Sequence, residues 1–251
     1  RAVAHSIRAL ISKLKDKAEE YLLPNLYTLL LYKKINLTNT LRSLYPMQIT
    51  SIIRRAAQIN PQGIATIYED RQQTWIQMLD RVARLAGGLQ GLGMKTGDRV
   101  ALLSLNSDRY IEYYFASVWG GGAMMPMNIR WAVAECVYAL NDAGAEILIV
   151  DEAFKGIAVE IKLQVPGLKT LIYGGDGETP EGMENYQDIV ASSAATEDAG
   201  RGGDDLAGIF YTGGTTGFPK GVMLSHTNLY VGGVANAHEL NMREGTVYLH
   251  A

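Results

Sequence analysis

Short apolar segments that alternate with amphipathic helices constrain the fold of this chain most. Residues 99–105, 123–127 and 147–150 are short apolar runs typical of buried strands, and apolar residues at helical spacing fill the ranges 108–119 and 131–142 between them. Strands joined by helices of ten or more residues run parallel, and a parallel sheet is covered on both faces. The sequence therefore predicts an α/β fold with mainly parallel sheet layers and helices on both faces.

The segment before this alternation also has clear signals. We expect an amphipathic helix over residues 49–59, followed by a short hairpin whose strands are 64–68 and 72–75. Thr74 and Gln77 have the spacing of a capping box, which predicts the start of the next helix. That helix is expected to bury one apolar face, made of Ile76, Leu79, Val82, Ala83, Ala86 and Leu89.

The later elements are predicted in the same way. The polar residues 106–108 can cap the helix after the first core strand, and the side chains expected to point inward from it are Ile111, Tyr114, Phe115, Val118 and Trp119. Residues 168–173 predict another strand, whereas 174–204 is rich in Gly, Asp, Glu and Ser and predicts loops. A last helix is expected over 227–240.

The most distinctive stretch of the chain is a loop between two apolar runs, residues 212–220, which we call the Gly/Thr loop. Glycines let the backbone approach a ligand closely. Consecutive N–H groups in such a turn form an anion-binding nest, to which Thr hydroxyls add donors and Lys adds a positive charge. The pattern therefore predicts phosphate binding by Thr212, Gly213, Gly214, Thr215, Thr216, Gly217 and Lys220.

The charge pattern around this loop agrees with phosphate binding. No acidic residue lies between Asp205 and Glu239, and Lys220 is the only formally charged side chain in that interval. The alternative, a Gly-rich hairpin turn, needs neither three Thr nor this length. Two common nucleotide loops do not match: Pro219 and Gly221 flank the lysine where a Walker loop has Gly and Ser or Thr, and the glycine spacing is not GxGxxG.

The segment 211–222 resembles the signature loop of the adenylate-forming superfamily, which contains acyl-CoA synthetases, firefly-type luciferases and the adenylation domains of peptide synthetases. The superfamily pattern, aromatic-Thr-Ser/Gly-Gly-Ser/Thr-Thr-Gly-x-Pro-Lys-Gly-Val, is matched at every place. Residues 97–101, 122–130 and 140–151 resemble further segments of the same proteins. The resemblance covers residues 47–251 and is greatest to the acyl-CoA synthetase branch, which implies an incomplete AMP-binding N-terminal domain.

The resemblance implies an ATP-dependent ligase that converts a small-molecule carboxylate into an acyl-adenylate and then into a coenzyme A thioester. By resemblance, Thr212, Thr215 and Thr216 would donate hydroxyls to the β- and γ-phosphates of ATP, and the glycines would lend backbone N–H groups. Lys220 would be the catalytic cation; the alternative for Lys220 is a solvated flanking charge. The Mg²⁺ ligands, the adenylation lysine and the mobile C-terminal domain are expected beyond Ala251, so we expect this chain to be inactive alone.

Three functional hypotheses remain open at this point. The first is an acyl-CoA synthetase for a fatty acid or a related organic acid. The second keeps the adenylation but changes the acceptor, as in peptide-synthetase adenylation or luciferase-like oxidation. The third is a non-catalytic nucleotide-binding module, which would bind ATP without turnover.

The composition excludes several other classes of function. The net charge of −3 gives no reason to expect nucleic acid as a partner. The single cysteine, Cys136, cannot form an internal disulfide, which suits the cytoplasm, and it lies on a helix face where a buried, inert thiol is expected. Four scattered His offer no metal-ligand spacing, so no metal ligands are predicted within the chain. No apolar run approaches the ~20 residues that span a bilayer.

Residues 1–46 differ from the rest of the chain in charge. They carry eight Lys or Arg against three Asp or Glu, a net charge of +5, whereas the remaining residues have a net charge of −8. The first methionine, Met47, stands where the resemblance begins. We therefore expect two parts, a basic extension over 1–46 and the AMP-binding part over 47–251. The hypothesis for the extension is that translation of the natural protein starts at Met47.

Overall fold

The structure, a computed structural model, describes residues 46–213 and 217–250. Of the extension predicted over residues 1–46, only Pro46 is among the described residues. The described part contains a seven-stranded sheet in the order β7-β6-β5-β3-β4-β8-β9. Every pair of neighbours is parallel except β8 and β9, which form an antiparallel hairpin. The strands are β3 (Arg99–Leu103), β4 (Ala123–Pro126), β5 (Ile147–Val150), β6 (Thr170–Tyr173), β7 (Glu184–Asn185), β8 (Leu206–Thr212) and β9 (Lys220–Ser225).

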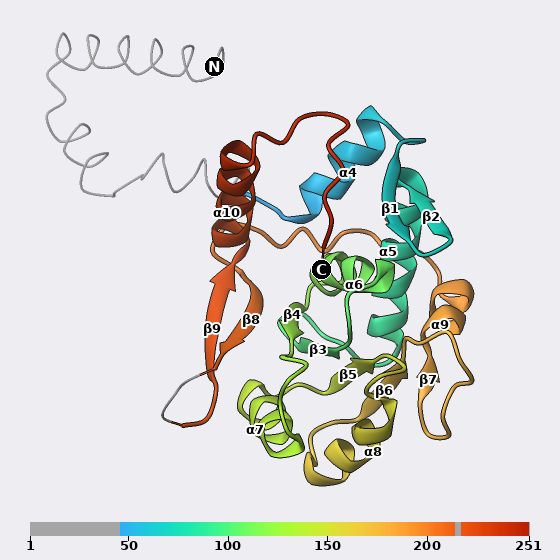
Figure 1. The fold of residues 1–251 in the computed structure, drawn as a ribbon, viewed down its shortest axis with the longest axis vertical. Helices are drawn as coiled ribbons and strands as arrows, with labels where there is room; N and C mark the ends of the chain where they lie inside the picture. The colour runs from blue at the N-terminus through green and yellow to red at the C-terminus, as the bar shows by residue number, and fades with distance from the viewer. Residues whose placement is uncertain (1–45, 214–216, 251) are drawn as a thin grey trace, which may run out of the picture. The chain divides into compact units, whose positions relative to one another are not determined.

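Helices cover both faces of this sheet, which confirms the predicted fold class. Figure 1 shows α5 and α6 on one side of the sheet and α7 and α8 on the other. The helices are α4 (Thr50–Ile59), α5 (Trp75–Gly91), α6 (Asp108–Trp119), α7 (Val133–Ala143), α8 (Lys155–Gln164), α9 (Tyr186–Ser192) and α10 (His226–Glu239).

The alternation of side chains along the strands produces two separate hydrophobic cores. In β3, Val100 and Leu102 point into the core formed with α4, α5, α6 and α9, whereas Ala101 and Leu103 point into the core formed with α7 and α8. Cys136 is fully buried in the second core, and this burial raises the pKa of its thiol to about 11. The expected burial of this thiol is therefore confirmed, and a raised pKa disfavours the reactive thiolate.

The predicted elements before the sheet are present with small shifts. Strands β1 (Ile64–Tyr68) and β2 (Arg71–Thr74) form an antiparallel hairpin. The capping box is confirmed, because Gln77 N donates to Thr74 Oγ1 at 3.4 Å and Thr74 N donates to Gln77 Oε1 at 2.8 Å. Trp75 was expected in the second strand of the hairpin, but this cap makes it the first residue of α5 instead.

Other predictions for individual faces and loops were confirmed in part. The predicted apolar face of α5 packs in the core except at its start, where Ile76 is 43% exposed and Met78 is buried instead. In α6, Val118 and Trp119 are buried as predicted, and Ile111, Tyr114 and Phe115 are half-buried and pack against the core. Tyr113 is fully buried but was not predicted to point inward. The segment 174–204 is not entirely loop, since it contains β7 and α9.

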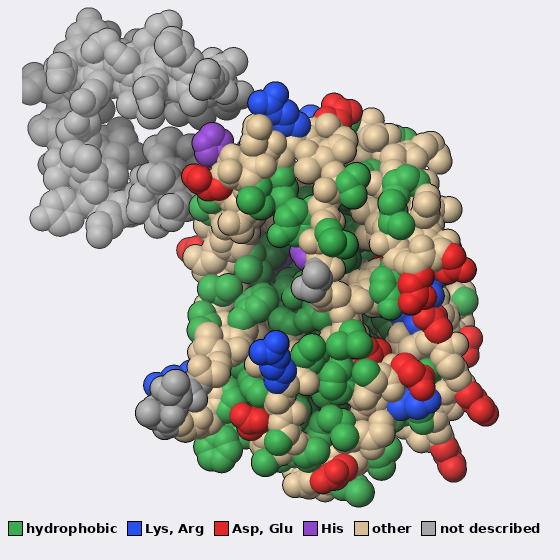
Figure 2. All heavy atoms as spheres, in the orientation of Figure 1, with side chains coloured by type: hydrophobic (Ala, Val, Ile, Leu, Met, Phe, Trp, Pro, Cys, Tyr) green, Lys and Arg blue, Asp and Glu red, His purple; other side chains and the backbone are tan. Residues whose placement is uncertain are grey.

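The surface of the described part is divided by side-chain type. In the view of Figure 2, acidic side chains gather along the right-hand edge, whereas hydrophobic side chains fill the centre. The exposed hydrophobic residues of the β8–β9 hairpin and α10 include Phe218, Val222, Met223, Val231 and Val234. Among the described helices, none combines the length and the hydropathy that a membrane crossing would require.

A buried polar network lies beside the apolar face of α6 and was not predicted from the sequence. Glu112 of α6 is fully buried and accepts hydrogen bonds from Arg81 at 2.6 and 3.0 Å. Gln73 donates to the same carboxylate at 2.7 Å. The hydroxyl of Tyr186 also donates to it, at 2.8 Å. One turn earlier, Asp108 accepts two 3.0 Å hydrogen bonds from the guanidinium of Arg71.

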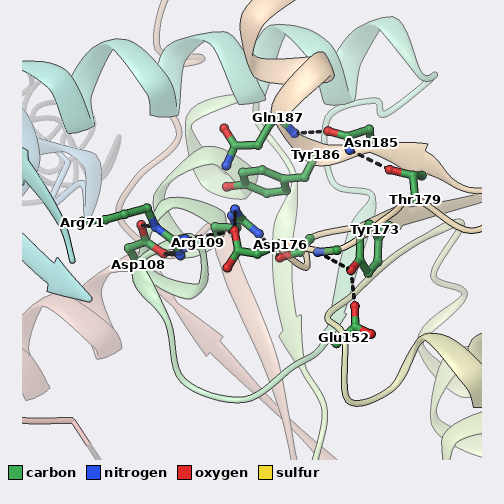
Figure 3. Close-up of polar contacts among 12 residues, drawn as sticks. Arg71, Asp108, Arg109, Glu152, Tyr173, Asp176, Thr179, Asn185, Tyr186 and Gln187 are labelled. Atoms are coloured by element: carbon green, nitrogen blue, oxygen red, sulfur yellow. Dashed lines mark hydrogen bonds and ion pairs between the residues drawn. The ribbon is translucent and has the colours of Figure 1, made fainter. Parts of the chain in front are cut away.

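The network continues beyond α6 to the loop after β6. Figure 3 shows Arg71 and Arg109 turned toward Asp108 and Asp176. Arg71 Nη1 donates to Asp176 Oδ1 at 2.9 Å, and Arg109 pairs with the same carboxylate. These two arginines lower the pKa of Asp176 against the opposing effect of burial. Together with Arg81, they balance the charges of Asp108, Glu112 and Asp176, so the network is structural rather than a site that attracts ions.

Candidate functional site

The β8–β9 hairpin holds the Gly/Thr loop at its tip. The last pair in the register of the hairpin is Thr212 with Lys220, and Thr212 Oγ1 lies 3.4 Å from the carbonyl oxygen of Lys220, to which it donates. Directly opposed residues of an antiparallel pair project their side chains on the same face. The hairpin therefore places the hydroxyl of Thr212 and the ammonium group of Lys220 on one face, both exposed to solvent.

The loop leaves the sheet at the edge where the parallel strands end. Strand β8 is parallel to β4, with Met124 opposite Gly208. A Cβ at Gly208 would lie 2.6 Å from Met124 Cγ, so only glycine lets β8 approach β4 this closely. Ligands of open α/β sheets bind outside the carboxyl ends of the strands. The hairpin thus presents the Gly/Thr loop at the edge where such ligands are expected.

The structure describes four of the seven predicted phosphate-binding residues. Thr212 and Lys220 are brought together across the hairpin, and Gly213 and Gly217 flank the connection at exposed positions. The backbone of Gly217 has φ of +152°, a conformation that favours glycine. The other three predicted residues, Gly214, Thr215 and Thr216, lie outside the described residues.

The strand that enters the loop is anchored to α7 through Tyr211. The hydroxyl of Tyr211 donates to Asp142 Oδ2 at 2.6 Å and also lies 3.3 Å from the carbonyl oxygen of Ala139. The indole of Trp131 meets the ring of Tyr211 edge to face, with 5.9 Å between centroids. Burial, followed by the hydrogen bond to Asp142, raises the pKa of Tyr211, so the hydroxyl stays protonated and acts as a donor.

Glycine 221 makes room for this anchor. It lies opposite Tyr211 in the hairpin register. A Cβ on Gly221 would approach Ile209 Cγ2 to 2.8 Å and Tyr211 Cζ to 3.0 Å, distances shorter than van der Waals contact. The glycine that follows Lys220 therefore has a packing reason to be there: it lets the ring of Tyr211 lie flat across the partner strand.

The connection just before β9 contacts the same helix. The ring of Phe218 stacks on Tyr138 of α7, with 4.5 Å between centroids and 20° between the ring planes. The sequence pattern did not identify Tyr138 or Asp142 as neighbours of the hairpin, because both are distant from it along the chain. Asp142 and Tyr211, for example, are separated by 69 positions. The only signal was the pair of aromatic residues that flank the loop.

His226 closes the far end of the hairpin. Ser225 caps α10 by accepting from Asn228 N at 3.2 Å, and His226 is the first residue of the helix. Its imidazole is fully buried, and its Nδ1 accepts from Ile49 N at 3.4 Å, which attaches the start of α4 to the hairpin. This burial lowers the pKa of His226. The contacts of this histidine are thus structural.

The Gly/Thr loop does not fit a magnesium site by itself. Mg²⁺ takes oxygen ligands and is usually bound by one or two carboxylates together with the phosphates of a substrate. The interval from Leu206 to His238 has no carboxylate side chain. Within the described ranges, moreover, no three His, Cys, Asp or Glu residues are grouped so that they could hold a metal ion.

Comparison with known proteins shows which family and which proteins this chain is similar to. A model of the family described as AMP-binding enzyme matches residues 53–251. Among curated proteins, the chain is 30% identical over 213 residues to the chloroplastic/peroxisomal 2-succinylbenzoate–CoA ligase of Arabidopsis thaliana, which covers 80% of this chain and 38% of that protein. It is 34% identical over 168 residues to the long-chain-fatty-acid–CoA ligase of Thermus thermophilus, which covers 66% of this chain and 30% of that protein.

The chain is also similar to solved structures. The crystal structure of ATP-bound MatB from Rhodopseudomonas palustris is similar with a TM-score of 0.67 and 28% sequence identity. The match covers 77% of this chain and 38% of that one. The chain thus spans about a third of the length of the curated relatives it matches.

Proposed function

Because this chain belongs to the AMP-binding enzyme family, we propose that it forms part of an AMP-forming acid–thiol ligase. The substrates are ATP, an organic carboxylate and coenzyme A. The observation that supports this most is the hairpin, which combines an exposed hydroxyl, an exposed ammonium group and exposed glycines at the carboxyl edge of the sheet. The similarity to CoA ligases that act on different acids supports the reaction but not one particular acid.

The proposed reaction has two steps. A carboxylate oxygen attacks the α-phosphorus of ATP, and the bond from that phosphorus to the pyrophosphate oxygen breaks, giving an acyl-adenylate. The sulfur of coenzyme A then attacks the acyl carbon, and AMP leaves. A carboxylate is a poor electrophile, so adenylation is needed to supply a leaving group. The work of the protein is to position the groups and to stabilise the departing pyrophosphate.

Individual residues of the loop have distinct proposed roles. The hydroxyl of Thr212, with those of Thr215 and Thr216, would donate to the β- and γ-phosphates, and the glycines would provide backbone N–H groups or the space for them. Lys220 would be the catalytic cation that balances the charge of pyrophosphate as it leaves. The exposed position of Lys220 opposite Thr212 supports this role, because both groups can reach one anion. Mg²⁺ would accompany the ATP, with its protein ligands outside this chain.

The acid is proposed to be a fatty acid or a related organic acid, and the compartment to be the cytoplasm. We further propose that residues 47–251 produce no AMP alone, because the segment spans so little of its relatives. An assay of the purified segment for carboxylate-dependent AMP tests this point. AMP above the background without acid would contradict it.

Carboxylate-dependent exchange between ATP and labelled pyrophosphate tests the proposed function in the complete protein. The acids should range from acetate to long-chain fatty acids and should include aromatic acids. We expect one class of acid to start the exchange, and Thr216→Ala and Lys220→Ala each to lower it by about 10- to 1,000-fold, as expected for the loss of a group that stabilises developing charge. A folded protein that binds ATP but shows no exchange with any acid would favour a non-catalytic nucleotide-binding module.

A further inference from the structure

Both ends of the Gly/Thr loop rest on one helix, α7. The residue before Thr212 reaches Asp142 and Ala139, and Phe218, near the other end of the loop, stacks on Tyr138. Tyr138 and Asp142 are four residues apart, so they project from the same face of the helix. Two contacts of different kinds, one from the end of β8 and one from the connection just before β9, therefore meet a single stripe on α7.

The entering strand is fixed by several contacts at once. The hydroxyl of Tyr211 is held at 2.6 Å by the carboxylate of Asp142, and its ring is bounded by Trp131 on one side and by Gly221 on the other. A hydrogen bond to a charged acceptor is about twice as strong as one between neutral groups. A change in the χ1 angle of Tyr211 would break the hydrogen bond and lose the edge-to-face contact, so these contacts together fix the direction of the side chain.

The segment just before β9 contacts α7 through a stacked pair of rings. Phe218 is 60% exposed, and its described aromatic partner is Tyr138. The stacked geometry at 4.5 Å gives this large apolar side chain a reason to lie on α7 rather than free in water. Pro219, which follows it, is buried and fixes the backbone dihedral just before Lys220.

These contacts set the direction of the groups proposed to bind phosphate. Side chains alternate along a strand, so Tyr211 on the α7 side places Thr212 on the opposite side of the hairpin. Lys220 shares that side, because it is directly opposite Thr212. A shift of Tyr211 away from α7 would move both groups together, since they belong to the same terminal pair.

We propose that α7 positions Thr212 and Lys220, the terminal pair of the hairpin, for nucleotide binding, with Asp142 and Tyr138 as positioning residues that act through Tyr211 and Phe218. This inference rests on the proposed function, since the group to be positioned is the phosphate chain of ATP. It assigns a role in the ATP half of the reaction to a helix that lies outside the loop itself. Neither residue needs to touch the nucleotide.

The test uses the complete protein and measures ATP binding by calorimetry as well as pyrophosphate exchange. Tyr211→Phe removes only the hydroxyl, and Asp142→Ala removes the nearer of its two acceptors, the other being the carbonyl oxygen of Ala139. Both variants should weaken ATP binding and raise KM for ATP about tenfold, because a misplacement of about 1 Å can cost up to a hundredfold. KM for the acid should stay within about twofold. The double variant should be no worse than either single one, because both remove the same interaction.

A second pair of variants tests the stacking contact. Tyr138→Leu removes the aromatic face and should raise KM for ATP several-fold, whereas Tyr138→Phe keeps the face and should restore it. The matched control is Tyr173→Phe on β6, whose hydroxyl contacts Glu152 away from the hairpin. This control should change neither ATP binding nor either KM.

The possible results separate the two proposals. If the wild-type protein exchanges pyrophosphate and the α7 variants bind ATP as tightly as it does, the positioning role is wrong and the proposed function stands. If the variants raise KM for acid and ATP equally, or the Tyr173→Phe control behaves like them, the effect is a general loss of structure and the positioning role is also wrong. If the wild-type protein neither binds nor exchanges ATP, the proposed function and this inference fail together.

Discussion

Tyr211 and Gly221 show how a single position connects the packing of the hairpin to its proposed chemistry. In the sequence, Gly221 is only one position of the pattern that covers residues 211–222. In the structure, the absence of a side chain at Gly221 is what lets the ring of Tyr211 cross the partner strand and reach Asp142. The proposed phosphate-binding role would explain the polar residues of the loop, whereas packing explains this glycine.

Gly221→Ala tests that division. The added Cβ would lie 2.8 Å from Ile209 Cγ2 and 3.0 Å from Tyr211 Cζ, so either the ring of Tyr211 or the strand has to move. We expect a destabilisation of about 1–3 kcal/mol, as for overpacked sites, together with a higher KM for ATP. Urea unfolding and pyrophosphate exchange of the complete protein measure the two effects.

The matched control is Gly156→Ala in helix α8, where an added Cβ meets nothing within 4 Å. This change should stabilise the protein by about 0.5–1 kcal/mol, because alanine loses less conformational entropy in a helix than glycine. Gly221→Ala with unchanged stability and unchanged KM would show that Tyr211 does not depend on that space.

The sequence predicted the residues of the loop but not their supports. Thr212, Lys220 and the glycines are adjacent in the chain, so their chemistry is visible as a local pattern. Asp142 and Tyr138 are distant in sequence and sit on a helix whose other residues have the ordinary pattern of a core helix. Only the fold, which sets α7 beside the end of β8, brings them to the loop.

At the scale of elements, the buried Glu112 joins three helices and a strand. It accepts from Arg81 of α5, Gln73 of β2 and Tyr186 of α9. Apolar periodicity could not identify it, because a glutamate reads as a solvent-facing residue unless its partners are known. The same reason explains the missed α9, whose polar neighbourhood looked like loop while Tyr186 and Val190 are buried.

Glu112→Ala should therefore be among the most damaging changes in the described part. It leaves Arg81 in a partly buried place without its carboxylate, and breaking a buried ion pair from one side costs about 3–5 kcal/mol. Asp80→Ala is the control, since Asp80 pairs with Arg84 on the surface and such pairs contribute about 0–1 kcal/mol. Chemical denaturation compares them; equal losses for the two variants would contradict the structural role of the network.

The junction between α10 and α4 predicts a dependence of stability on pH. Burial lowers the pKa of His226 below its ordinary 6.5, and Arg201 acts in the same direction, whereas Asp205 and Asp198 oppose the shift. Below pH 6.5 the unfolded chain therefore binds more protons than the folded one. The stability contributed by the neutral histidine is fully present above about pH 6.5 and is lost as the pH falls below that value.

Unfolding of the wild-type protein and of His226→Asn between pH 5 and 8 measures this effect. Asparagine keeps an oxygen that can accept from Ile49 N but does not titrate. The wild-type protein should lose more stability than the variant as the pH falls from 6.5 to 5. Parallel pH profiles for the two proteins would show that the protonation of His226 is not linked to folding.

At the scale of the whole described part, the sequence predicted the architecture well because alternation of strands and helices leaves few arrangements. A parallel sheet covered on both faces followed directly from that alternation, and the two cores are its consequence. The order of the strands did not follow, because the crossovers that place β3 between β4 and β5 leave no local signal. That order is what sets β8 beside β4 and the loop at the carboxyl edge.

The central claim is that this edge supports adenylation, and direct detection of the intermediate tests it most directly. The complete protein is incubated with ATP and the acid that starts exchange, without coenzyme A, and the products are identified by mass spectrometry. Adenylation predicts an acyl-adenylate and pyrophosphate, and then AMP and a thioester once coenzyme A is added. Formation of ADP with an acyl phosphate, or a thioester without any adenylate, would contradict the claim.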